Sequence, residues 1–285
     1  MTERAPHPWL EVARDEAPLI VSIPHAGTEI PEAFLSRFAS PWLARVDADW
    51  WMPELYDFAG SLGATVIRTR ISRSVIDVNR DPSGVSLYPG QATTELCPVS
   101  TFDGEPLYRG GEEPAAADIA ERRVAYFDPY HEALSSEIAR LRARHPVVVL
   151  YDAHSIRSVV PRLFEGTLPN FNIGTNDHRA ADPALGHRVE EACDGVAGFT
   201  RITNGRFKGG YITRSKGRPD AGVHAVQMEL AIRSYAPEPS GRPAEANWPP
   251  PYDERTAEPV RAVLKRVLGT CLEFATTHTK RRGDP

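Results

Sequence analysis

The sequence predicts an α/β fold, with a mixed, mostly parallel central sheet and helices on both faces. Residues 19–23 and 147–151 are short, strongly apolar runs, which are typical of strands buried on both sides. Strand-like runs at residues 64–67 and 223–230 alternate with segments of helical periodicity, as in sheets covered by helices. A chain of 285 residues is long enough for one large domain of this class, and we expect a single domain over residues 1–285.

The order of the elements follows from periodicity and from the residues that begin and end helices. In chain order, we expect strands at residues 19–23, 64–67, 147–151 and 223–230, and helices at 31–35, 49–62, 115–144, 183–193 and 259–276. Pro31 suits the first turn of a helix, and Gly63 suits the position just after a helix. Pro129 is expected to kink or break the third helix. Residues 75–80 are either a further strand or an extended segment.

The segments between these elements are rich in turn-forming residues. We expect irregular structure at residues 1–18, 81–114, 155–180, 205–217 and 236–251. A loop as long as 81–114 inside a compact domain is usually functional, and a decorated surface loop is the alternative.

The composition is that of an ordinary soluble globular protein. The chain is 41% hydrophobic and 25% charged, and its net charge of −5 disfavours nucleic-acid binding. No apolar run approaches the roughly 20 residues that a transmembrane helix needs, so no membrane partner is expected. The three cysteines form no CxxC pair, which fits a reduced, cytoplasmic setting without a zinc knuckle. The sequence makes no prediction of oligomeric state.

Two histidines stand at the ends of two predicted strands. His25 follows the run at 19–23, and His154 follows the run at 147–151. Ligands of open α/β sheets gather at the carboxyl ends of strands, so a metal ion is what two such imidazoles would share. Catalytic zinc sites add a third protein ligand, and a carboxylate at the start of the next helix is well placed. We prefer Asp49 for that ligand, with Glu29 and Asp47 as rivals; each lone histidine has a structural alternative.

A general base is expected beside such a metal. Glu229 lies within the largely apolar run 223–230, where a carboxylate is costly unless it is paired or catalytic. A zinc-activated water needs a carboxylate to take its proton. The alternative places Glu229 on the solvent face of an edge strand.

Several arginines lie near these residues. Arg68, Arg70, Arg73 and Arg80 fall within thirteen residues, and a glycine-rich segment carries Arg206, Lys208 and Arg214. Because the arginine fork binds carboxylates, this supply suggests a small acidic substrate. Salt bridges to the protein's own acidic residues are the alternative for most of them, and we retain Arg80, which follows Asn79. No GxxxxGK[ST], GxGxxG or GxSxG pattern supports a nucleotide site or a serine nucleophile.

These segments together resemble the N-formylglutamate amidohydrolase family. The matching motifs are IPHAGT (23–28), DADW (47–50), SRSVIDVNR (72–80), SLYPGQ (86–91), YDAHSIRS (151–158), LFEG (163–166), NIGTN (172–176), NGRFKGGYITR (204–214) and HAVQMEL (224–230). They run in order through most of the chain. The family is similar in fold to the zinc carboxypeptidases and aspartoacylases, so the resemblance implies a zinc-carboxypeptidase-like architecture.

The resemblance also implies a role for each site residue. Zinc, or another divalent metal, is expected on His25, Asp49 and His154, and Glu229 is expected to act as general base and then general acid. Asn79 and Arg80 would bind a substrate carboxylate. Arg73 would stabilise the oxyanion or bind the second carboxylate, for which Arg214 is a weaker candidate. Carboxypeptidases have Glu three residues after the first histidine, whereas position 28 here is threonine, which makes Asp49 less secure than the histidines.

The expected activity is metal-dependent hydrolysis of N-formyl-L-glutamate to formate and L-glutamate, a reaction of bacterial histidine degradation. One alternative is a metal-dependent deacylase acting on another N-acyl acidic amino acid. A second alternative is a non-catalytic homologue that binds a small acidic metabolite.

Overall fold

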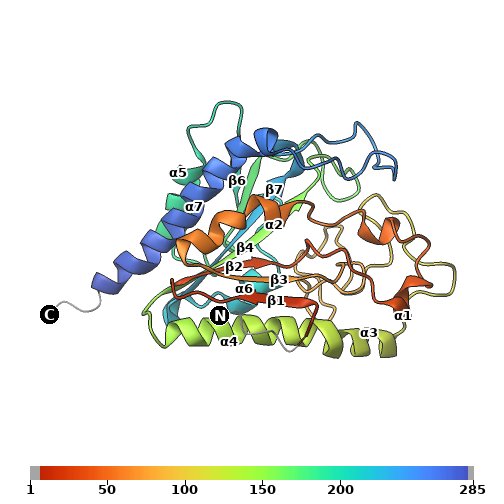
Figure 1. Ribbon diagram of the computed structural model, residues 1–285, viewed down its shortest axis with the longest axis horizontal. Helices are drawn as coiled ribbons and strands as arrows, with labels where there is room; N and C mark the ends of the chain where they lie inside the picture. The colour runs from red at the N-terminus through yellow and green to blue at the C-terminus, as the bar shows by residue number, and fades with distance from the viewer. Residues whose placement is uncertain (1–6, 282–285) are drawn as a thin grey trace.

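A computed structural model describes residues 7–281 of the chain, and side chains through residue 277. The predicted architecture is confirmed, because a single mixed sheet lies between two layers of helices (Figure 1). The strands are β1 (Leu10–Ala13), β2 (Leu19–Ile23), β3 (Thr65–Thr69), β4 (Val148–Ile156), β5 (Phe171–Gly174), β6 (Arg201–Thr203) and β7 (Val223–Ala231). The α-helices are α1 (Glu32–Leu35), α2 (Met52–Leu55), α3 (Ala116–Arg122), α4 (Asp128–Arg142), α5 (Pro183–Cys193), α6 (Tyr211–Lys216) and α7 (Glu254–Arg281).

The strand order in the sheet is β1-β3-β2-β4-β7-β5-β6. The neighbouring strands β3, β2, β4 and β7 run parallel to one another, whereas β1 and β5 pair antiparallel at either side of them. Parallel strands have their carboxyl ends at the same edge of the sheet. The segments that follow β2, β3, β4 and β7 therefore meet at one edge.

Helices bury the apolar side chains of the strands on both faces. Helices α2, α5 and α7 cover one face, where Leu185 and Leu264 belong to the same buried cluster as Tyr151 and Val226 of the strands. Helices α4 and α6 cover the other face, with Leu134 and Ile212 in its core. This double cover explains why the central strands are continuous apolar runs in the sequence. Within residues 7–281, no helix is both long and apolar enough to cross a membrane.

The structure corrects several expected elements. Strand β1 lies in the expected lead-in, β5 lies in the stretch 155–180, and α6 lies in the glycine-rich segment. Residues 75–80 form turns, not a strand. The reason is local, because Asp77 Oδ1 accepts the Asn79 amide at 2.9 Å and so holds the backbone in a turn.

Two further expectations differ in detail. The helix expected at 115–144 is not broken at Pro129, since a π-helical turn, Arg123–Phe127, joins α3 to α4 and Pro129 lies in the first turn of α4. Strand β4 is longer than expected, so His154 lies within the strand and not after it.

Candidate active site

The loops after β2 and β3 come together at a glycine. At Gly27, a Cβ atom would lie 2.3 Å from the Ile71 carbonyl oxygen, so only glycine allows this approach. The Glu29 amide donates to the Arg70 carbonyl, and the Ser72 amide donates to the Glu29 carbonyl, both at 2.8 Å. This pairing brings the segment after β3 alongside the segment that carries His25.

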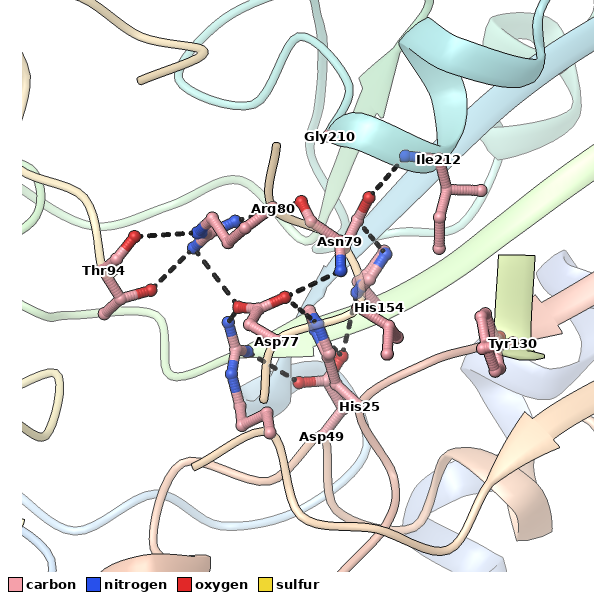
Figure 2. Close-up of polar contacts among 12 residues, drawn as sticks. His25, Asp49, Asp77, Asn79, Arg80, Thr94, Tyr130, His154, Gly210 and Ile212 are labelled. Atoms are coloured by element: carbon pink, nitrogen blue, oxygen red, sulfur yellow. Dashed lines mark hydrogen bonds and ion pairs between the residues drawn. The ribbon is translucent and has the colours of Figure 1, made fainter. Parts of the chain in front are cut away.

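Three buried ligand-type side chains converge at the carboxyl edge of the sheet. The ligand atoms of His25, Asp49 and His154 all lie within 4.8 Å of one another (Figure 2). Asp49 Oδ2 lies 3.1 Å from His154 Nδ1 and 3.7 Å from His25 Nδ1. The predicted third ligand is thus the carboxylate that the fold brings to the two histidines.

The far nitrogen of each imidazole meets a buried carboxylate. His25 Nε2 lies 2.7 Å from Asp77 Oδ1, and His154 Nε2 lies 3.1 Å from Asp152 Oδ2. An ionised carboxylate only accepts hydrogen bonds, so the contact with Asp77 places a proton on His25 Nε2 and leaves His25 Nδ1 as a lone pair. His154 Nε2 also lies 2.9 Å from Asn79 Nδ2, and its Nδ1 faces Asp49 Oδ2. Carboxylates in this position commonly orient metal-binding histidines.

One buried side-chain atom of this ligand group has no hydrogen-bond partner in the described part of the chain. His25 Nδ1 is buried without a hydrogen-bond partner among the described residues, and it faces Asp49. Two imidazole nitrogens and a carboxylate oxygen are the donor set of a zinc site that keeps a position open. The residues present therefore fit a divalent metal.

The electrostatics of the group favour a cation. Burial opposes the charge on Asp77, yet Arg80, His25 and Arg73 hold the pKa of its carboxyl well below the usual range. Burial also lowers the pKa of His25, with help from Arg73, and keeps that imidazole neutral. Burial lowers the pKa of His154 as well, but Asp152 and Asp49 outweigh burial and hold that pKa well above its usual value, so a metal ion bound here would displace a proton from His154.

The rival ligands lie elsewhere. The Glu29 side chain is exposed and forms an ion pair with Arg70. Asp47 is half-buried, but its Oδ2 accepts the Phe102 amide at 2.7 Å and it lies outside the group of three. Burial raises the pKa of Asp47 to about 6.

Glu229 lies directly across from His154 in the sheet. The two residues are paired in register on β4 and β7, so their side chains lie on the same face. Strand β7 is an interior strand and Glu229 is 7% exposed, so the edge-strand alternative is wrong. Burial raises the pKa of Glu229 to about 8, and Gln227 Nε2 donates to its Oε2 at 3.2 Å.

Arg73 and Asn79, predicted from the segment 72–80, contact the buried carboxylates of the site. Arg73 Nη2 donates to Asp77 Oδ2 at 2.6 Å, and Nη1 lies 3.5 Å from Asp49 Oδ1. Asn79 Oδ1 accepts the Ile212 amide at 2.8 Å (Figure 2), and its Nδ2 donates to Asp152 at 3.2 Å. In the structure, both side chains therefore hold other members of the site in place.

The two remaining arginine candidates differ in position. Arg80 lines the cavity, and its guanidinium donates to the carbonyl and hydroxyl oxygens of Thr94 at 3.1 and 2.9 Å. Arg214 donates to the Gly209 carbonyl and stacks on Tyr88, with its guanidinium carbon 4.9 Å from the ring centre. Among the residues with described side chains, Arg214 is not part of the cavity lining.

A cavity of about 190 Å³ opens over these groups. Its lining includes His25, His154, Gln227 and Glu229, which we call the strand wall. It also includes residues 81, 84–88 and 92–96 of the segment 81–96; we call this segment, with Arg206 and Phe207, the loop wall. Pockets for drug-sized ligands measure roughly 300–1,000 Å³, so this cavity suits a smaller metabolite.

Sequence reasoning did not assign four residues of this site. Asp152 and Gln227 each lie two residues before a predicted site residue on the same strand, so strand alternation was a usable signal. Asp77 lies within a quoted motif. Arg206 had no signal that distinguished it from Arg214 in the same glycine-rich segment.

Known proteins match the chain over most of its length. A family model described as N-formylglutamate amidohydrolase matches residues 17–236. The N-formylglutamate deformylase of Pseudomonas aeruginosa is 43% identical over 265 residues, which cover 93% of this chain and 96% of the relative. The N-formylglutamate deformylase of Pseudomonas putida is 40% identical over 264 residues, with the same coverage of 93% and 96%.

Two solved structures share the fold. The crystal structure of N-formylglutamate amidohydrolase from Ralstonia eutropha gives a TM-score of 0.68 at 23% identity, covering 95% of this chain and 98% of that chain. A protein from Agrobacterium tumefaciens gives a TM-score of 0.69 at 20% identity, covering 93% and 94%.

Proposed function

The chain belongs to the N-formylglutamate amidohydrolase family, and we propose that it hydrolyses N-formyl-L-glutamate to formate and L-glutamate. The observation that carries this proposal is the position of Glu229, which faces His154 across two strands beside the candidate metal ligands. The arginines that line the same cavity suit an acidic substrate. Histidine degradation is the route that the resemblance implies for this reaction.

His25, Asp49 and His154 are the residues that would hold the metal, with zinc as the proposed ion. Bound there, it would supply Lewis-acid activation of water and of the formyl carbonyl. Asp77 and Asp152 orient the two imidazoles, and Asn79 links Asp152 to α6. Buried side chains therefore fix the orientation of both histidine ligands.

Glu229 performs the proton transfers. Its carboxylate accepts a proton from the attacking water and returns it to the amide nitrogen as the C–N bond breaks. A pKa raised to about 8 by burial suits a group that must both take and release a proton near neutral pH. Arg73 lines the cavity, and in this proposal it stabilises negative charge on the formyl oxygen.

The test compares three substrates on the zinc-loaded protein: N-formyl-L-glutamate, N-formyl-L-aspartate and N-acetyl-L-aspartate. We expect kcat/KM to be highest on N-formylglutamate, by about 10-fold or more over the substrate that is one methylene shorter. Removal of the metal with a chelator should abolish turnover, and added zinc should restore it.

Other outcomes identify the alternatives. Faster turnover of N-acetylaspartate would point to a deacylase of another acidic amino acid. Absence of turnover on all three substrates, with L-glutamate still bound, would point to a non-catalytic homologue.

A further inference from the structure

N-formylglutamate carries two carboxylates, and the cavity must compensate both charges. The described cations that line it are Arg73, Arg80 and Arg206. Arg73 is compensated by ion pairs with Asp77 at 2.6 Å and Asp49 at 3.5 Å, whereas Arg80 has one longer ion pair, with Asp77 at 3.7 Å. One guanidinium other than Arg73 and Arg80 is therefore needed for the second carboxylate.

The positive charge of Arg206 is not paired with a carboxylate of the described residues. Within residues 7–277, no carboxylate oxygen lies within ion-pair distance (4.0 Å) of its guanidinium. Burial lowers the pKa of Arg206, and neighbouring Arg80 lowers it further, although Tyr88 and Glu229 raise it. A half-buried cation without an anionic partner is costly, and a ligand carboxylate would remove that cost.

The guanidinium of Arg206 is oriented by neutral groups only. Its Nε donates to the Leu163 carbonyl at 3.1 Å, and its Nη2 donates to the Ala92 carbonyl at 2.9 Å. Its central carbon lies 5.5 Å from the ring centre of Tyr88 and 5.4 Å from that of Phe207. These contacts hold the fork in place, and no described acceptor is paired with Nη1.

The backbone that carries Arg206 is fixed from behind. At Gly174, a Cβ atom would lie 2.5 Å from the Gly209 amide nitrogen, so β5 and the glycine-rich segment touch through their backbones. The Tyr88 hydroxyl accepts the Lys208 amide at 3.1 Å and donates to the Gly209 carbonyl at 2.9 Å.

A strained turn adds to this support. The consecutive residues Asn176, Asp177 and His178 all have left-handed backbone, with φ of 52°, 52° and 64°. Such conformations persist only where the surrounding structure over-determines them, and they cluster at functional sites. The Asn176 amide donates to the Lys208 carbonyl at 2.6 Å, which ties this turn to the segment of Arg206.

We infer that Arg206 is a specificity-determining residue that binds the side-chain carboxylate of the substrate, while Arg80 holds the α-carboxylate. The inference rests on the proposed function for the identity of the substrate. It assigns to Arg206 the role that sequence reasoning had offered to Arg73 or Arg214.

The test compares each acidic ligand with its neutral isostere. Arg206→Gln should lower kcat/KM on N-formyl-L-glutamate by about 100-fold, mainly through KM, because a charge-assisted pair is lost. It should leave kcat/KM on N-formyl-L-glutamine unchanged, which also shows that the variant is folded. Lys208→Gln is the matched control, since it removes a charge in the same segment from a side chain that pairs with Asp177 at the surface.

Binding of L-glutamate and L-glutamine, measured by calorimetry on the metal-loaded protein, separates this inference from the proposed function. Wild type should prefer L-glutamate, and Arg206→Gln should bind the two equally. If wild type releases no formate, the proposed function fails and the binding comparison still decides the role of Arg206. A preference for L-glutamate that survives in Arg206→Gln, or that is lost instead in Arg214→Gln, would overturn the inference.

Discussion

The two walls of the cavity are built in different ways. The strand wall carries His25, His154, Gln227 and Glu229 on or just after interior strands, and every one of these side chains is buried. The loop wall is largely exposed over residues 83–86 and 89–92, and its cation Arg206 is held by carbonyl groups and aromatic rings. The difference suggests that the strand wall determines the chemistry and the loop wall determines which ligand is accepted.

The largest expected effect lies on the strand wall. Glu229→Gln keeps the size of the side chain but removes its proton transfer, so kcat should fall by about 1,000-fold or more. Elemental analysis should show that the metal is retained. A rate of formate release within about 10-fold of wild type would contradict the assignment of Glu229 as the proton-transfer group. It would also contradict the division of roles between the two walls.

Metal binding should depend on the ligand group His25, Asp49 and His154 and not on the loop wall. His154→Ala removes one of three ligands and should weaken zinc binding by at least about 100-fold, as measured by competition with a chelator. Glu29→Gln is the matched control, because Glu29 was a rival ligand and its side chain is exposed. Stoichiometric zinc in purified His154→Ala, or zinc loss in Glu29→Gln, would refute the proposed ligand set.

Removing a carboxylate that contacts a metal ligand should reduce zinc affinity less than removing the ligand. Asp152→Asn weakens the acceptor for His154 Nε2 without removing a ligand, so zinc affinity should fall by about 10- to 100-fold. The same titration measures it. An unchanged affinity would mean that Asp152 does not orient the imidazole.

A substitution that displaces the loop wall should change KM more than kcat. Gly174→Ala places a methyl group against the Gly209 backbone and should displace the segment that carries Arg206. We expect KM for N-formylglutamate to rise by about 10-fold while kcat changes by less than about 3-fold, since misplacement of a binding group alone costs this much. Gly269→Ala in α7 is the control, because a Cβ there meets nothing within 4 Å. A fall in kcat at constant KM would show that the two walls are not separable.

The last prediction concerns stability and not activity, and it rests on the buried His131 of α4. Burial, with a contribution from Lys216, lowers the pKa of His131 to about 4, and its Nε2 donates to the Val78 carbonyl at 2.8 Å. The unfolded chain takes up this proton below about pH 6.5 and the folded protein does not, so stability falls as the pH drops. The loss attributable to His131 should be roughly 2 kcal/mol between pH 7 and pH 5.

Urea unfolding of wild type and His131→Gln over this pH range measures the contribution. The variant should lose less stability on acidification by that amount. Equal pH dependence in the two proteins would show that protonation of His131 does not reduce the free energy of unfolding.

The sequence by itself determined the class of fold and most of the strand wall. Interior parallel strands must be apolar on both faces, so a histidine or glutamate within or just after such a strand is conspicuous in the chain, as His25, His154 and Glu229 were. Helix α5 was predicted at its observed bounds because Asp182, Pro183 and a periodic apolar face mark it locally. The short strands β1 and β6 carry too few residues for a periodic signal to stand out.

Only the tertiary structure decided the remainder of the site. The register between β4 and β7, which sets Glu229 opposite His154, depends on pairing between segments far apart in the chain. The choice of Asp49 over Glu29 and Asp47 depends on how the loop after β2 packs against Ser155, whose amide donates to Asp49 at 3.1 Å. Arg206 and Arg214 lie on one short segment, and the same residue type lines the cavity or stacks outside it according to contacts with Leu163, Ala92 and Tyr88. Such long-range contacts leave no local pattern, because they arise from the packing of the whole chain.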